Sequence, residues 1–167
     1  MSSLNVLPDH ARLWLLALSS RPDPAVSLRL RAGLDALLAQ WRHKGQVYQG
    51  AGEFLEPQLI AVAEPNLAAQ PSGCAIDGML RRTRRLVEEL GLSLVDPDVS
   101  VLIRDQGGLT AIAKTELQAR LEDGTLAADT PVLDLSLYSL GELRAGRLER
   151  PLGATWIARR YRLAVDA

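Results

Sequence analysis

The residue best suited to chemistry in this sequence is its single cysteine, Cys74, which lies in the segment 71–77 (PSGCAID). The pattern predicts a strand before this segment and a helix from Cys74 onward. In the first turn of a helix, the positive end of the helix dipole and unpaired backbone N–H groups favour the nucleophilic thiolate. Cys74 is therefore the candidate catalytic nucleophile. The alternative, which is more frequent for an unpaired cysteine, is a small buried side chain with no chemical role.

The neighbours of Cys74 complete this candidate site. Asp77 is a candidate acid–base residue, although we favour a structural role in capping the helix or in an i,i+4 ion pair with Arg81. Ser72, Gly73 and Arg81 are candidate ligand-binding residues. The two histidines of the chain, at positions 10 and 43, do not have a spacing that requires a Cys–His pair.

A run of arginines follows Cys74 at positions 81, 82, 84 and 85. The run suggests an anion-binding patch. However, Glu88 and Glu89 lie four residues beyond Arg84 and Arg85, a spacing that favours a solvated helix face with ion pairs.

A second cluster near the end of the chain holds Trp156, Arg159, Arg160 and Tyr161. Such residues stack on a base or bind a phosphate. The alternative, which we favour, is a closing strand over 156–161 with an exposed basic side.

Motifs for nucleotides and metals are absent from the sequence. It has no G-x-x-x-x-G-K-[ST] loop, and the two glycines at 50 and 52 lack the third glycine of a dinucleotide fingerprint. It also has no C-x-x-C and no H-x-x-x-H spacing. We expect no cofactor, no metal and no ATP hydrolysis.

Composition narrows the classes of partner. The chain has 167 residues, with 19 basic and 20 acidic residues and a net charge of −1. This balance argues against a dedicated nucleic-acid binder, because such proteins carry a basic surplus. One cysteine excludes an intrachain disulfide. The N-terminal residues do not resemble a signal peptide, and the apolar run 13–18 is too short to span a bilayer. We expect a cytoplasmic protein with no membrane partner, and a homodimer remains open.

The elements that position these residues follow from periodicity and capping signals. The pattern predicts strands at 12–19, 46–54, 58–63 and 99–104. It predicts one helix that begins with Asp23 as N-cap and Pro24 at the first helical position and ends near Gly45, and another over 74–90 that Gly91 closes. This order is βαββαβ, the ferredoxin-like plan, in which two helices cover one face of an antiparallel sheet with 12–19 and 58–63 at its centre.

Residues 106–167 form a second block, which we expect to be a small C-terminal α/β extension packed on a first domain of residues 1–105. Capping boxes are predicted at Thr115–Gln118 and Ser139–Glu142, each before a short helix, and Gly124 ends the first of these helices. A short strand is predicted at 130–135.

Several short segments resemble a small bacterial family that is often found in Bacteroidetes-type genomes and commonly labelled "ABC transporter ATPase". The matching segments are 7–14 (LPDHARLW), 40–45 (QWRHKG), 59–64 (LIAVAE), 72–77 (SGCAID) and 129–132 (DTPV), with Thr155, Trp156 and Arg160 near the end. The resemblance implies a shared fold and little about activity. The ATPase label lacks support from the residues, because the phosphate loop is missing.

Three hypotheses for function follow from the sequence. The leading one is a small-ligand-binding or protein-binding module. The alternatives are a thiol-dependent enzyme or redox-responsive protein that uses Cys74, and an RNA-binding protein that uses the sheet face and Arg81–Arg85. The RNA hypothesis lacks exposed aromatic residues interleaved with the basic ones. Whether the protein is an enzyme stays open at this point.

Overall fold

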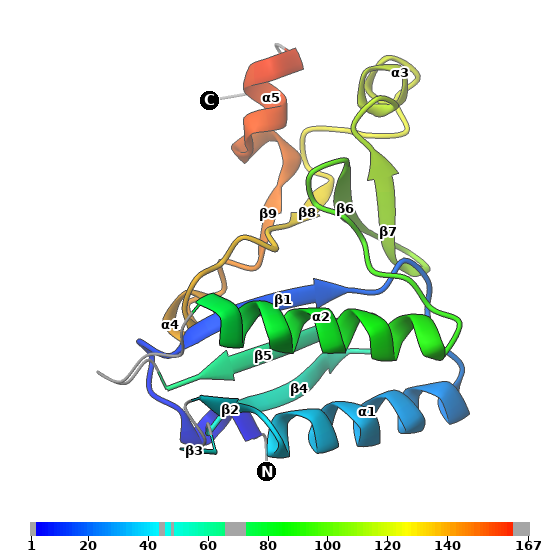
Figure 1. The fold of residues 1–167 in the computed structure, drawn as a ribbon. Coiled ribbons are helices and arrows are strands. Elements are labelled where there is room, and N and C mark those ends of the chain that lie inside the picture. Colours follow the sequence, from blue (N-terminus) through cyan, green and yellow to red (C-terminus); the bar gives the residue numbers. More distant parts are fainter. Residues whose placement is uncertain (1–2, 44–45, 48, 66–72, 162–167) are drawn as a thin grey trace.

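The computed structural model describes residues 3–43, 46–47, 49–65 and 73–161, which form an α+β fold with two main antiparallel sheets (Figure 1). The strands are β1 (Arg12–Ala17), β2 (Arg42–His43), β3 (Gln46–Val47), β4 (Ala51–Glu56), β5 (Leu59–Glu64), β6 (Ser100–Asp105), β7 (Gly108–Ala113), β8 (Pro131–Leu133) and β9 (Glu149–Pro151). The α-helices are α1 (Pro24–Ala39), α2 (Gly73–Glu89), α3 (Leu117–Glu122), α4 (Leu140–Arg144) and α5 (Trp156–Tyr161), and the 3-10 helices are η1 (Ser3–Val6) and η2 (Leu152–Ala154).

The first sheet has the order β1-β5-β4, with all neighbours antiparallel and β5 at its centre. Alternate residues of each strand point to the same face. On one face Ile60 and Val62 of β5 pack with buried residues of α1 and α2, which lie side by side across the sheet (Figure 1). The prediction that both long helices cover one face is confirmed.

Two glycines allow α1 to approach its neighbours closely. A Cβ at Gly33 would lie 2.7 Å from Leu86 of α2, and a Cβ at Gly52 of β4 would lie 2.6 Å from Leu38 of α1. Both distances are shorter than van der Waals contact, so a larger residue at either position would require these leucine side chains to shift.

The opposite face of the first sheet is also buried. Leu13, Leu15, Ala61 and Ala63 pack there against η1 and against the segment around α4, which returns from the C-terminal part of the chain. Because both faces are covered, all six residues of β5 are buried. This agrees with its continuous apolar sequence.

The predicted fourth strand does not join this sheet. It is β6, which belongs to a second sheet with the order β7-β6-β8-β9. The edge of β1 instead carries two isolated bridges, from Leu18 to Leu94 and from Arg12 to Ser139. The chain turns away after Val95, because Asp96 accepts hydrogen bonds from the N–H groups of Asp98 and Ser100 at 2.9 Å. The α+β class is thus confirmed, but a ferredoxin-like sheet of four strands is not.

Polar contacts fasten the two sheets together. Arg104 of β6 donates two hydrogen bonds to Glu56 of β4, at 2.9 and 2.8 Å, and one to Glu149 of β9 at 2.6 Å. Gln58 donates to the carbonyl of Leu109 at 2.9 Å. The domain boundary after residue 105 stays a prediction. The β6–β7 hairpin extends across that position.

Local capping signals gave several correct boundaries. The Asp23 side chain accepts from the Val26 N–H at the start of α1, and Ser139 and Glu142 form the predicted capping box of α4. Gly91 has a φ of +73°, as expected of a glycine that ends a helix. The first helix, however, ends at Ala39, before the predicted boundary.

Two local predictions near the C-terminus are wrong. Thr115 does not cap α3; the N-cap is Glu116, without a side-chain hydrogen bond, because the turn after β7 directs the Glu116 N–H to the carbonyl of Ala113 at 2.9 Å. Residues 156–161 are helix α5 and not a closing strand. Thr155 accepts from the N–H of Ile157 at 3.3 Å, which begins the helix.

Candidate ligand-binding groove

The start of α2 holds most of the residues that the sequence singled out. Cys74 lies in the first turn of this helix and is exposed, so the buried role expected of an unpaired cysteine is not observed. Gly73 and Asp77 are exposed beside it, while Ser72 lies outside the described residues. Within the described ranges, neither Asp77 nor Arg81 is part of an ion pair, and no hydrogen bond joins Cys74 to His10.

The arginine run on α2 behaves as a solvated helix face. Arg85 pairs with Glu89 at 2.9 Å, and both side chains are largely exposed. Arg82 donates to the carbonyl of Gly78 at 3.3 Å. The ion-pair interpretation of this run is therefore confirmed at one of its two predicted pairs.

A buried ion pair lies at the same end of the first sheet as the start of α2. Arg12 of β1 and Glu64 of β5 are register partners, and Glu64 is fully buried. Arg12 lies over the ring of Trp14, which contacts Trp41 edge to face at a centroid distance of 6.2 Å. The indole N–H of Trp41 donates to the carbonyl of Ala75 in α2 at 3.1 Å. Residues from four separate segments of the chain, 7–14, 40–45, 59–64 and 72–77, thus contribute to this cluster.

The electrostatics of this cluster point to a structural role. Burial by itself lowers the pKa of Arg12, but the hydrogen bond and negative charge of Glu64, together with Tyr138, more than offset it, so the net shift is upward. Two opposite charges that neutralise each other in a buried position hold strands in register. They do not provide a general base for Cys74.

A concave site lies elsewhere, in the second sheet. It is a groove of about 440 Å³ at the place where β6 and β8 separate, bounded on one side by α5; we call it the β6–β8 groove. Its apolar lining includes Val95, Val101, Leu102, Leu133, Leu135 and Trp156. Ligand sites of small molecules have volumes of roughly 300–1,000 Å³ and a mostly apolar lining with a few polar groups.

The polar lining of the β6–β8 groove is mainly cationic. Lys114 after β7, Arg150 of β9 and Arg159 of α5 line it together with one carboxylate, Asp134. Arg150 is paired with Asp134. In the described part of the chain, Lys114 and Arg159 have no carboxylate partner, so the groove presents two uncompensated positive charges.

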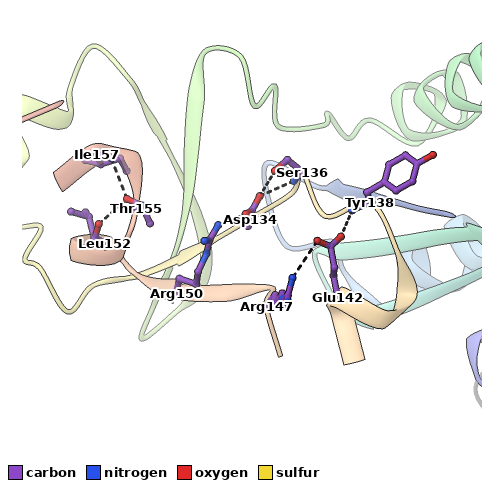
Figure 2. Close-up of polar contacts among 9 residues, drawn as sticks. All are labelled: Asp134, Ser136, Tyr138, Glu142, Arg147, Arg150, Leu152, Thr155 and Ile157. Carbon is purple, nitrogen blue, oxygen red and sulfur yellow. Dashed lines mark hydrogen bonds and ion pairs between the residues drawn. The ribbon is translucent and has the colours of Figure 1, made fainter. Parts of the chain in front are cut away.

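Asp134 is held in its ionised form. It accepts hydrogen bonds from the Ser136 hydroxyl at 2.5 Å and from the Ser136 N–H at 3.0 Å, and Arg150 lies on its other side (Figure 2). Burial raises the pKa of this carboxyl, but the donors of Ser136 and the charge of Arg150 outweigh it and leave the pKa below its ordinary value.

Trp156 supplies an aromatic surface to the groove. Trp156 is 47% exposed, so part of its ring is accessible to a ligand. The ammonium of Lys114 lies 5.6 Å from the ring centroid and also donates to the carbonyl of Asp98 at 3.0 Å. These two contacts fix Lys114 at the end of the groove where Trp156 lies.

Sequence reasoning found part of this groove. The sequence offers Trp156, Arg159, Arg160 and Tyr161 as a base-stacking or phosphate-binding cluster, the less favoured alternative to a closing strand. Trp156 and Arg159 of this cluster line the groove, and their i,i+3 spacing in α5 puts them on one side of the helix. Lys114, Asp134 and Arg150 were missed, because they come from three separate elements. Asp134 and Ser136 lie two residues apart, a spacing typical of a turn, and this is the local signal in the sequence for the point where the chain leaves β8.

Comparison of the chain with protein-family models, with curated proteins and with solved structures gives no match. The resemblance to the bacterial family therefore stays a prediction. In the described residues, no three histidine, cysteine or acidic side chains cluster in a way that would hold a metal ion, and no helix is long and apolar enough to cross a membrane.

Proposed function

We propose that the protein is a small-ligand-binding module and that its ligand is an anion held in the β6–β8 groove. One observation carries this proposal: a groove of about 440 Å³ is lined by three cationic side chains, one carboxylate and a half-exposed tryptophan. Asp134 compensates only Arg150, so Lys114 and Arg159 attract a negatively charged group. The apolar lining then favours a ligand with an apolar body beside that group.

The test compares two adjacent arginines. Arg159 lines the groove, whereas Arg160 is not among its lining residues and lies beside Tyr161. Binding of benzoate, inorganic phosphate and N-acetylphenylalanine would be measured by isothermal titration calorimetry. We expect at least one probe to bind the native protein and to bind Arg159→Glu at least tenfold more weakly, since the charge at the groove changes by two units.

Arg160→Glu is the matched control, because it makes the same charge change one residue away. It should leave the affinity within about threefold of the native value, the loss that long-range charge alone produces at physiological ionic strength. Equal losses in both variants, or no binding by any of the three anions, would overturn the proposed function.

The exposure of Cys74 favours one second candidate, a thiol-dependent or redox-responsive protein. An accessible sulfur is a requirement for such chemistry. The groove supports the leading candidate better, because it offers a concave surface and several convergent polar groups. RNA binding, a cytoplasmic location and a homodimer remain predictions from the sequence.

A further inference from the structure

The β6–β8 groove exists because one ladder of the second sheet is short. β6 pairs with β7 over its whole length, from Ser100 to Asp105, but with β8 only at Leu102 and Ile103. The register Leu102↔Leu133 would place Leu135 opposite Ser100 if the ladder continued. The chain leaves the sheet at Asp134 instead, and Ser100 and Leu135 both line the groove.

This opening leaves a backbone acceptor at the groove. The carbonyl of Val99 accepts from the Lys114 N–H at 2.8 Å on the β7 side, so the next carbonyl, that of Ser100, points to the opposite side, toward the groove. The N–H of Ser100 is already bonded to Asp96 at 2.9 Å. Among the described residues, no backbone N–H donates to the Ser100 carbonyl. A buried or half-buried carbonyl without a donor is costly unless water or a ligand supplies one.

The acceptor and the cations lie at the same end of the groove. Lys114 is joined to Val99 through its backbone and to Trp156 through its ammonium, and Arg159 follows Trp156 by three residues on α5. A ligand at this end therefore meets two positive charges, one backbone acceptor and an aromatic ring.

Resting on the proposed function, we infer that the ligand is a carboxylate with an adjacent amide, as at the C-terminal end of a peptide or in an N-acylated amino acid. The carboxylate lies toward Lys114 and Arg159, the amide N–H donates to the carbonyl of Ser100, and an apolar side chain packs against Trp156. A simple aromatic acid satisfies the cations but provides no donor for the Ser100 carbonyl, and inorganic phosphate provides no apolar group for Trp156.

The experiment removes one group of the ligand at a time and leaves the native protein unchanged. The reference probes are N-acetylphenylalanine and N-acetylleucine, which differ in side chain. Three analogues of the first are 3-phenylpropionate, which lacks the amide, N-acetylphenylalanine amide, which lacks the negative charge, and 2-acetoxy-3-phenylpropionate, in which an ester oxygen replaces the N–H. Dissociation constants would be measured by isothermal titration calorimetry.

We expect at least one reference probe to bind, and all three analogues to bind at least tenfold more weakly than N-acetylphenylalanine if that probe is the tighter one. If N-acetylleucine binds more tightly than N-acetylphenylalanine, the three corresponding analogues of N-acetylleucine are measured instead. The tripeptide Gly-Gly-Phe then separates the two sources: tighter binding than N-acetylphenylalanine indicates a peptide terminus, and weaker binding indicates a free N-acylated amino acid.

Two results would overturn the inference and leave the proposed function intact. One is equal binding of the ester or of 3-phenylpropionate, and the other is binding of benzoate or phosphate while neither reference probe binds. By contrast, binding that is insensitive to Arg159→Glu would overturn the proposed function itself.

Discussion

The start of α2 and the β6–β8 groove contain similar kinds of residue in opposite arrangements. At the start of α2, the side chains of Cys74 and Asp77 are exposed, while the charged residues of the neighbouring cluster, Arg12 and Glu64, are buried and neutralise each other. In the groove, Lys114 and Arg159 converge with Trp156 on one concave surface and keep their positive charges uncompensated. The first arrangement holds strands together, and the second is suited to attract a ligand.

This difference shows what distinguishes a structural charge from a functional one. A buried, paired charge affects stability mainly because the removal of its partner would leave it buried and uncompensated. A charge that lines a cavity without a partner is available to a molecule that enters. The predictions below test this distinction from the largest expected effect to the smallest.

The largest effect is expected from Glu64→Ala. The substitution leaves the guanidinium of Arg12 buried without its counter-charge, which costs about 3–5 kcal/mol of the free energy of unfolding. Urea denaturation followed by circular dichroism measures this loss. Glu89→Ala, which removes an exposed pair with Arg85, is the control and should cost about 0.5 kcal/mol or less.

A double variant sharpens this prediction. Arg12→Met with Glu64→Leu replaces both charges by apolar side chains and should regain most of the lost stability, because no unpaired charge remains. If the single and double variants were equally destabilised, the loss would come from packing and not from the buried charge.

The second effect concerns the junction of the two sheets. Glu56→Gln weakens the two hydrogen bonds from Arg104 and removes their charge assistance, and should lower the free energy of unfolding by about 1–2 kcal/mol. The same urea titration measures it. Because neither Glu56 nor Arg104 lines the β6–β8 groove, ligand affinity should change little. A large loss of affinity would mean that the junction also shapes the groove.

The local features of the fold were predictable from the sequence, because neighbouring residues determine them. Asp23 caps α1 through a bond to a residue three positions away, and Gly91 ends α2 by its own backbone conformation. The continuous apolar sequence of β5 predicted a central strand. In each case the deciding interaction is short-range.

The groove was not predictable in the same way, because it depends on a register between distant strands. Nothing near Ser100 indicates that β8 will pair with β6 at only two positions. Likewise, the turn of Asp96 to Ser100 directs β6 into the second sheet, whereas the sequence predicted that this strand would join the first sheet. Trp156 and Arg159 carried a local signal, but their convergence with Lys114 arises from tertiary structure.

The third effect is a pH dependence at Asp134. The folded protein holds its pKa below the ordinary value of 3.8, so ionised Asp134 stabilises the fold above that pH and the contribution is lost as the pH falls through the folded pKa. Asp134→Asn should therefore be about 1 kcal/mol less stable than the native protein at pH 7, because its bonds with Ser136 and Arg150 lose their charge assistance. The difference should shrink below pH 4.

Urea titrations at pH 7, 5, 4 and 3 measure the difference in the free energy of unfolding between the native protein and Asp134→Asn. The variant also frees Arg150 in the groove, so N-acetylphenylalanine should bind to it more tightly, by about threefold. A gap that stays constant down to pH 3 would contradict the role of the Asp134 charge in stability.

The smallest effect is expected at Cys74, although it is the residue with the most reactive side chain. Its sulfur is exposed and makes no described hydrogen bond, so Cys74→Ser should change the free energy of unfolding by less than about 0.5 kcal/mol. Iodoacetamide should label the native protein at a rate within a few-fold of that in 6 M urea, as mass spectrometry can follow. The β6–β8 groove lies in the other sheet, so labelled protein should bind N-acetylphenylalanine as unlabelled protein does. If labelling abolished binding, the two regions would be coupled, and the division between a structural and a ligand-binding part of the molecule would fail.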